Sequence, residues 1–463
     1  MPTVLAVILT FIFMWWLFRR DKHQKLDVTR AVWIPFWWFM IMATRAVSSW
    51  LALFGINVAG KSLEDGSPVD AVVYFILIAA GARVLSRRLV KLDVVIQKNA
   101  WLALYIAYCF VAIFWSEFPF VSLKRWVKDL GNPIMILVLL TEPNPRVAIT
   151  AFFKRCSYII VPVSVLFIKY IPEFGRGFNE WNGVGFNTGI TENKNALGWD
   201  CLILAAFFVW HILSTLQEEQ TKKRRNELVL SSFFLAGIFW LLSIADSKTP
   251  LLSLFVTIVL LIYTGRKSSQ KFISAKVFST IIIALLLDFT FDLYGTMLSL
   301  LGRDRTLTTR TDLWDLLLKW PINPILGTGY QSFWLGERRL RIWQILKWNA
   351  VVAHNGYLET YINLGVLGLL LMFGILASAY RKARLAFLND STGFARFRFA
   401  FFFAVLLYNW TETSLGGLHP VWFVFLLIAM EYPAAKPAEV WQQFRTRSTT
   451  QARSMTPVRI GVR

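Results

Sequence analysis

Apolar segments recur along almost the whole length of this 463-residue chain. Most are long enough to cross a bilayer as a helix, which takes roughly 17 to 25 residues for about 30 Å of hydrocarbon. The pattern predicts about 12 to 13 spans, near residues 2–18, 31–54, 69–85, 99–116, 126–141, 157–171, 195–214, 227–243, 250–264, 277–300, 356–380, 399–413 and 420–432. We therefore expect an all-α fold, a polytopic transmembrane helix bundle.

Composition supports a membrane protein, because 56% of the residues are hydrophobic, 17% are charged and the mean hydropathy is +0.51. The first apolar segment is followed by Arg19 and Arg20 without a small-residue cleavage site, so we expect it to be retained as a span. The cysteines, Cys109, Cys156 and Cys201, lack the close spacing of disulfide or zinc frameworks. We interpret them as packing residues.

Basic residues gather in alternate loops, at 19–30, 86–98, 142–156, 215–226, 265–276 and 381–398, and in the tail at 433–463. The positive-inside rule places such loops in the cytoplasm. The prediction is a membrane domain over 1–432 and a basic cytoplasmic tail over 433–463, with the N-terminus outside. The net charge of +21 then reflects contact with anionic membrane lipids, and no nucleic acid is expected as a partner.

One long external loop, about 302–355, breaks this rule. Its basic residues outnumber its acids, and it holds five tryptophans; the basic residues are Arg303, Arg305, Arg310, Lys319, Arg338, Arg339, Arg341 and Lys347. A solvated basic surface would explain the charge alone, since long loops are translocated regardless of charge. A binding site for a phosphate-bearing carbohydrate explains both the charge and the tryptophans.

Several common mechanisms lack their motifs. The chain has no GxxxxGK[ST] loop, no HExxH helix and no CxxC pair, which argues against an ATP-driven pump, a zinc peptidase and a thiol oxidoreductase. We predict no cofactor and no metal.

The most specific segment is Val351–Phe373, VVAHNGYLETYINLGVLGLLLMF, in which a His-Asn pair ends the external loop and a glycine-punctuated span begins. RTDLW and PINPILGTGYQSFW precede it, and TGITENKNALG, ADSKTPLLSL and NWTETS lie elsewhere. Together these motifs resemble the O-antigen ligase and polymerase superfamily over about residues 180–415. At Lys248 the ligases typically have an arginine. This lysine and the NWTETS motif make the chain more similar to the exopolysaccharide polymerase branch of the superfamily.

The resemblance implies the architecture of membrane class C glycosyltransferases and metal-independent, inverting glycosyl transfer. It implies a glycan on undecaprenyl diphosphate as the donor, a saccharide acceptor, and polysaccharide export or chain-length regulator proteins as further partners. The expected location is the bacterial inner membrane, with the active site facing the periplasm and the C-terminus in the cytoplasm.

Catalysis is expected from His354 as the general base and Arg310 as a diphosphate ligand. The other expected substrate-binding residues are Lys248, Lys194, Asn195, Arg303, Asn355 and Glu412, and Glu412 is also the reserve base.

Five of these candidates have a plainer interpretation. His354 could be a hydrogen-bonded structural residue and Arg310 a surface charge on an interfacial helix. Lys248 could anchor its hairpin at the membrane boundary, and Lys194 with Asn195 could begin a helix.

Three functions remain open from sequence. Transfer to another lipid-linked saccharide would make the protein a polymerase of an exopolysaccharide or O-antigen. Transfer to the sugar core of a lipid anchor would make it an O-antigen ligase. A flippase or exporter of lipid-linked saccharides would also hold a diphosphate with cations, but its cations should be accessible from both sides of the membrane.

Overall fold

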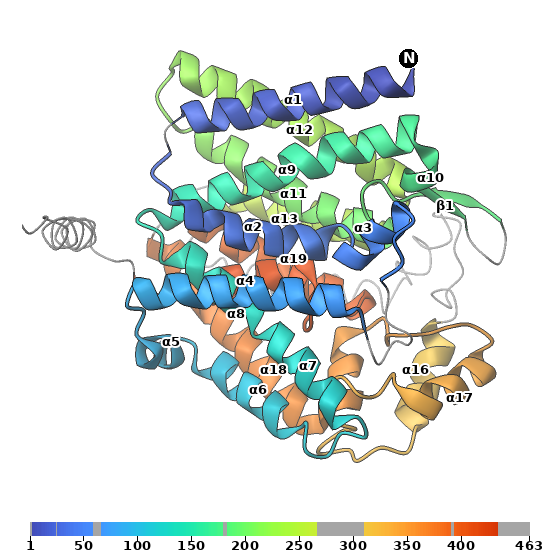
Figure 1. Ribbon diagram of the computed structural model, residues 1–463. Coiled ribbons are helices and arrows are strands. Elements are labelled where there is room, and N and C mark those ends of the chain that lie inside the picture. Colours follow the sequence, from blue (N-terminus) through green and yellow to red (C-terminus); the bar gives the residue numbers. More distant parts are fainter. Residues whose placement is uncertain are drawn as a thin grey trace, which may run out of the picture.

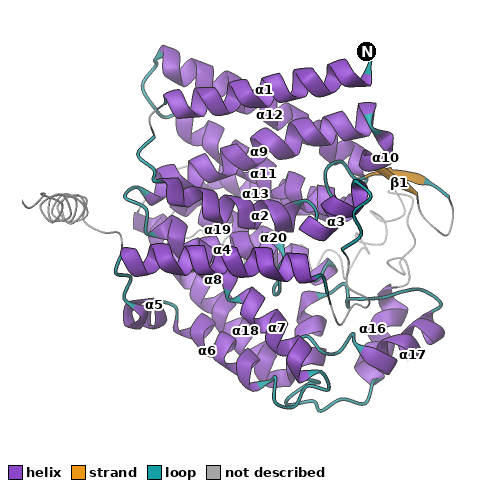
Figure 2. Ribbon diagram, in the orientation of Figure 1, coloured by secondary structure: helices purple, strands orange, loops and turns teal. Residues whose placement is uncertain are grey.

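The computed structural model describes residues 2–24, 26–58, 66–178, 183–265, 310–389 and 393–433. Helices dominate this part of the chain, as Figure 2 shows, and the strands in it form one antiparallel hairpin, β1 (Arg176–Phe178) with β2 (Gly185–Asn187). The predicted all-α class is confirmed. The predicted span 277–300, the external residues 302–309 and the predicted tail beyond residue 433 lie outside the described residues.

Six described helices are long and apolar enough to cross a membrane, namely α1 (Thr3–His23), α4 (Pro68–Arg87), α9 (Pro145–Tyr170), α11 (Lys194–Thr215), α12 (Lys222–Ala245) and α18 (Gly356–Asn389). Two bent pairs raise this number to eight if each pair is one span, and α13 (Lys248–Thr264) and α20 (Pro420–Ala429) are shorter apolar helices. The chain is thus a multi-pass membrane protein.

One bent pair breaks a predicted span, and the other bend lies at the start of a predicted span. The span at 31–54 consists of η1 (Arg30–Val32), α2 (Trp33–Ala43) and α3 (Val47–Leu53), with a 61° bend between the η1–α2 helix and α3. The span at 99–116 is α6 (Ala100–Val111), which meets α5 (Leu92–Lys98) at 102°. The span at 126–141 is likewise divided between α7 (Pro119–Asp129) and α8 (Gly131–Leu140).

The helices differ in how much of their surface is covered. Each of these helices contains an apolar stretch of 18 residues. The buried share of that stretch is 78% in α9 and 72% in α11, against 17% in α1 and 11% in α4. The helices α11, α13 and α19 (Phe394–Thr411) pack against one another, whereas α1 and α4 lie on the outside (Figure 1). The exposed apolar faces of α1 and α4 suit contact with lipid.

The described part of the external loop folds as a small helical unit. It contains α16 (Arg310–Lys319) and α17 (Gly336–Leu346), which cover a separate apolar cluster that includes Leu313, Phe333 and Ile342. Ile362 of α18 belongs to the same cluster, so the unit is docked on the bundle. Figure 1 shows it at the end of the bundle that also carries β1 and α3, with α5 at the opposite end.

A break in α18 holds the unit in place. Gly365 has φ +64° inside this helix, and a Cβ there would lie 2.1 Å from the carbonyl oxygen of Ile325, so glycine is required for both reasons. The backbone N–H groups of Val366 and Leu367 donate to the carbonyls of Pro324 and Ile325. The segment PINPILGTGY therefore supplies the hydrogen bonds that the break removes from α18.

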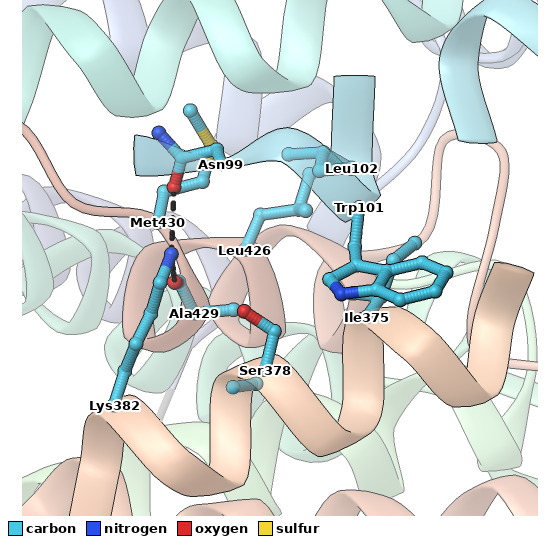
Figure 3. A pocket seen from close by; sticks show the side chains of 10 residues that line it. Asn99, Trp101, Leu102, Ile375, Ser378, Lys382, Leu426, Ala429 and Met430 are labelled. Atoms are coloured by element: carbon cyan, nitrogen blue, oxygen red, sulfur yellow. Dashed lines mark hydrogen bonds between the residues drawn. The ribbon is translucent and has the colours of Figure 1, made fainter. Parts of the chain in front are cut away.

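The far end of the bundle is tied at the bend between α5 and α6. Lys382 of α18 donates to the side-chain oxygen of Asn99 at 3.0 Å and to the carbonyl of Ala429, at the end of α20, at 3.2 Å (Figure 3). Asn99 also exchanges hydrogen bonds with the backbone of Glu431. These contacts fix three helix ends that are far apart in the sequence.

Candidate active site

Three of the predicted residues meet directly at the docked end of α18. Arg310, at the start of α16, forms a salt bridge with Glu412, with 2.7 Å between Nη2 and Oε1. The other carboxylate oxygen of Glu412 lies 3.1 Å from Nδ1 of His354. Arg310 also donates to the carbonyl of Thr411. Glu412 therefore links a guanidinium to an imidazole.

The contact with Glu412 determines which ring nitrogen of His354 is available. A carboxylate only accepts hydrogen bonds, so Nδ1 carries the proton and donates it to Glu412. In the neutral ring Nε2 is then the nitrogen with the free electron pair. The side chain of His354 is 24% exposed, and that of Glu412 is 14% exposed. The pair thus resembles the carboxylate and histidine of hydrolytic triads, in which the carboxylate orients a general base.

The surroundings keep Glu412 ionised. Burial by itself would raise the pKa of this carboxyl, but the hydrogen bond from His354 and the positive charge of Arg310 outweigh burial and bring the pKa below its usual value. Glu412 is therefore a poor general base at neutral pH. Its place in the cluster favours an orienting role, and His354 is the better candidate for the base.

The HNG sequence places His354 through three different local effects. His354 has a left-handed backbone, with φ +48°. The side-chain oxygen of Asn355 accepts from the N–H groups of Tyr357 and Leu358, so Asn355 begins α18 as a capping residue. A Cβ on Gly356 would lie 1.9 Å from the side-chain oxygen of Asn409 in α19. Gly356 thus lets HNGYLE approach NWTETS closely enough for His354 to reach Glu412.

Ala353, the residue before His354, is held through both its backbone N–H and its carbonyl. The carbonyl of Ala353 accepts from the indole of Trp314 at 2.7 Å, and its N–H donates to Glu359 at 2.8 Å. Trp314 stands four positions after Arg310, on the same face of α16. The spacing in RTDLW therefore lets one helix turn contact both Glu412 and the chain at His354.

Glu359 is a structural acid in this arrangement. Its carboxylate also accepts from the indole of Trp334 at 2.9 Å and from the amide of Asn363 at 2.9 Å. It joins α18 to the loop unit.

The two remaining motifs adjoin the same cluster. The hydroxyl of Ser247 lies 3.3 Å from the side-chain oxygen of Asn195, and the hydroxyl of Thr249 lies 3.1 Å from that of Thr411. A Cβ on Gly198 would lie 2.9 Å from that of Ser247, so glycine permits this close approach of α11 to the hairpin between α12 and α13. Hydrogen bonds thus connect TENKNALG and ADSKTP to NWTETS.

The predicted lysines lie at this junction with different surroundings. Lys248 begins α13 and pairs with Asp246 at 3.0 Å, and its side chain is 39% exposed. Lys194 is the first residue of α11, half-buried, and Asn193 rather than Lys194 or Asn195 caps that helix. Among the described residues Lys194 has no ion-pair partner. Both ammonium groups can therefore reach a ligand, and Lys248 would first leave Asp246.

Of the eight predicted site residues, Arg310 and His354 both contact Glu412, and Asn355 is adjacent. Asn195, Lys194 and Lys248 adjoin this cluster through Ser247 and Thr249. Arg303 lies outside the described residues. The catalytic and binding roles of these residues stay predictions.

The sequence leaves open the partner of one supporting residue, Arg45, a cation inside the predicted span at 31–54. Arg45 lies at the break between α2 and α3 and donates to the carbonyls of Thr191 and Phe174. It thereby fixes the chain just before α11. A cation inside an apolar segment was the available signal, but its partners are backbone carbonyls, which no sequence pattern marks.

Comparisons with known proteins agree with the motifs. A family model described as O-antigen ligase matches residues 231–373. The predicted resemblance to the O-antigen ligase and polymerase superfamily is confirmed. The matched residues include ADSKTP, RTDLW and HNGYLE but neither Lys194 nor Glu412, which come from the wider resemblance. The exopolysaccharide production protein ExoQ of Rhizobium meliloti (strain 1021) is 25% identical over 296 residues, which are 60% of this chain and 64% of ExoQ, slightly less than two thirds of that protein.

Proposed function

We propose that the protein transfers a saccharide from undecaprenyl diphosphate to a sugar hydroxyl, in polymerisation of an exopolysaccharide or O-antigen. The observation that carries the proposal is the His354–Glu412–Arg310 cluster beside the cations of two further motifs. The superfamily resemblance and the similarity to an exopolysaccharide production protein support the same conclusion.

The chemistry follows from the orientation of the imidazole. The acceptor hydroxyl attacks the anomeric carbon while Nε2 of His354 takes its proton. The bond between the anomeric carbon and the diphosphate oxygen breaks, and its electron pair leaves with undecaprenyl diphosphate. Attack opposite the leaving group inverts the anomeric centre. The proton accounts for the charge on the imidazole, which the carboxylate of Glu412 stabilises.

Negative charge develops on the leaving diphosphate and needs fixed cations. Arg310 uses one N–H on Glu412 and one on Thr411, which leaves three of its five N–H groups for a phosphate among the described contacts. Lys194 and Lys248 supply ammonium groups across the Thr249–Thr411 contact. Arg310 has then two roles, to keep Glu412 ionised and to bind the diphosphate.

The cellular location is part of the proposal. The alternation of basic loops supports an inner-membrane protein whose α16–α17 unit faces the periplasm and whose C-terminus is cytoplasmic. Topology reporters inserted at Lys347 and at Glu219 should report periplasm and cytoplasm. A cytoplasmic signal at Lys347 would exclude catalysis on the periplasmic side.

Two experiments test the activity. A deletion strain should accumulate single repeat units on undecaprenyl diphosphate, whereas long lipid-linked polymer would indicate a ligase, and repeat units confined to the cytoplasmic leaflet would indicate a flippase. Purified His354→Ala should keep donor affinity and lose about 10² to 10⁴ in turnover, because a positioned base contributes that much. Near-wild-type turnover in His354→Ala would leave the histidine a structural role.

A further inference from the structure

A cavity of about 320 Å³ lies next to the candidate active site. Two chain segments connect the cavity to the site. Thr413, which follows Glu412, lines the cavity, and so do Val351 and Val352, which precede Ala353 and His354. Thr411, on the other side of Glu412, contacts the lysine-bearing hairpin. In the chain, Glu412 thus stands between a residue that contacts the cations and a residue that lines the cavity.

The lining combines aromatic surface with a few polar atoms. Tyr330 and Trp334 contribute rings, and both are mostly buried, with the indole N–H of Trp334 already donated to Glu359. Aromatic faces pack against the C–H faces of sugar rings. Ligand pockets typically measure roughly 300 to 1,000 Å³ and are mainly apolar with few polar groups. The cavity is at the small end of that range and suits about one or two sugar rings.

The polar groups are held in place for a ligand. The amide of Gln331 donates to Asp129 at 2.7 Å, and the backbone of Gln331 is left-handed with φ +48°. This geometry leaves the amide oxygen of Gln331 as an acceptor. The hydroxyl of Thr413 is buried and has no hydrogen-bond partner among the described residues. A buried hydroxyl without a partner is costly, so a ligand hydroxyl at this position would be stabilising.

The cavity suits a different ligand from the group of Arg310, Lys194 and Lys248, which we call the cation side. Its described lining has one cation, Arg125, which already donates to the carbonyl of Gln331. A diphosphate is better served by Arg310, Lys194 and Lys248, none of which lines the cavity. A neutral, hydroxyl-rich ligand fits the cavity better.

We propose that this cavity is the saccharide subsite for the acceptor, with the reacting hydroxyl directed toward His354. The proposal rests on the proposed function, which requires an acceptor, and adds where that sugar binds and by which side chains. Donor and acceptor would then approach Glu412 and His354 from opposite sides, as in-line displacement requires.

A binding experiment separates this inference from the activity. The probe is the repeat saccharide released by mild acid from the lipid of the deletion strain and converted to its methyl glycoside. It has no diphosphate and can act only as an acceptor. Its binding to the purified full chain in nanodiscs is followed by saturation-transfer NMR. Undecaprenyl diphosphate, which carries no sugar, is titrated separately as the probe of the cation side.

Two variants change the cavity without touching the proposed catalytic groups. Val351→Trp fills the space from an exposed position and should weaken saccharide binding at least tenfold. Ile345→Trp adds the same ring at an exposed position of α17 and should leave binding unchanged. Thr413→Val keeps the shape but removes the hydroxyl, and should weaken binding about fivefold, whereas Thr413→Ser should retain wild-type binding.

Undecaprenyl diphosphate should bind all four variants as it binds the wild type. Equal saccharide binding by Val351→Trp and Ile345→Trp would overturn the proposal. Weaker binding of undecaprenyl diphosphate by Val351→Trp would also overturn it, because the cavity would then hold the donor lipid. Saccharide binding that Val351→Trp removes, in a protein that transfers no sugar, would support the subsite and contradict the proposed function.

Discussion

Replacing Glu412 by glutamine tests whether the carboxylate orients and charges His354. The substitution keeps the side-chain shape but removes the charge that accepts from Nδ1 of His354 at 3.1 Å and from Arg310 at 2.7 Å. A glutamine can present its NH₂ to the imidazole, which selects the wrong tautomer and places the proton on Nε2. Nε2 could then not take the proton of the acceptor hydroxyl.

The expected loss is large and confined to turnover. Two to four decades in kcat are typical when a base is removed, which is about 3 to 5 kcal/mol of transition-state stabilisation. Affinity for undecaprenyl diphosphate should not fall, because Arg310 gains a free N–H when its carboxylate partner is lost. The variant should also unfold slightly more easily, by about 1 to 3 kcal/mol, since a partly buried guanidinium loses a partner.

The assay measures initial rates of chain extension by purified protein in nanodiscs at saturating lipid-linked repeat, beside equilibrium binding of undecaprenyl diphosphate. Glu431→Gln is the matched control, because Glu431 pairs with Arg398 at 3.2 Å at the other end of the bundle. It should turn over as the wild type does. A kcat for Glu412→Gln within threefold of wild type would refute the reasoning, as would a loss confined to donor affinity.

Three further predictions have distinct expected results. Gly356→Ala should lower both the melting temperature and the activity, because overpacking against Asn409 costs about 1 to 3 kcal/mol of stability. Gly237→Ala in α12, where a new Cβ would lie 3.3 Å from a methyl carbon of Val161, should lower the melting temperature far less in the same thermal melt. Lys248→Arg should retain transfer and Lys248→Ala should lose it in the chain-extension assay, because the charge binds the diphosphate; full activity of the alanine variant would leave Lys248 an anchor. Burial lowers the pKa of His419 to about 4, below its ordinary value of about 6.5, so folded protein should lose stability as the pH falls from about 6.5 toward 4, by at most about 2 kcal/mol at pH 5. His419→Asn, which retains a helix-capping side chain, should show a flatter dependence of melting temperature on pH, and an unchanged slope would assign the effect elsewhere.

The sequence was sufficient for the bundle, and it named several residues that lie together in the structure. Long apolar segments predict helices that cross a bilayer, and the described helices occur where those segments lie. The motif resemblance predicted that His354, Arg310 and Glu412 belong to one site. In the sequence, Glu412 is 58 residues from His354 and 102 residues from Arg310. It also placed Asn355 in the site, where the structure shows a helix cap.

The breaks inside apolar segments could not be read from the pattern. Hydrophobicity is the same on both sides of Gly365, and only the nearby carbonyls of Pro324 and Ile325 show why α18 stops and resumes there. The bend at Arg45 has the same origin, since its partners are main-chain oxygens of distant loops. Such backbone contacts depend on tertiary packing and have no side-chain signature.

The position of Glu412 has a consequence for biosynthesis. The chain is made from the N-terminus, and the carboxylate that completes the cluster belongs to one of its last described helices, after α18 and α16 have emerged. Glu412 can meet His354 and Arg310 only when α19 has been inserted beside α18. Nascent or truncated chains that end before residue 412 would carry the histidine, the arginine and the lysines in a membrane that contains the substrate, yet would lack an oriented base. Under the proposed function, an incomplete chain would therefore be inactive until the bundle is assembled.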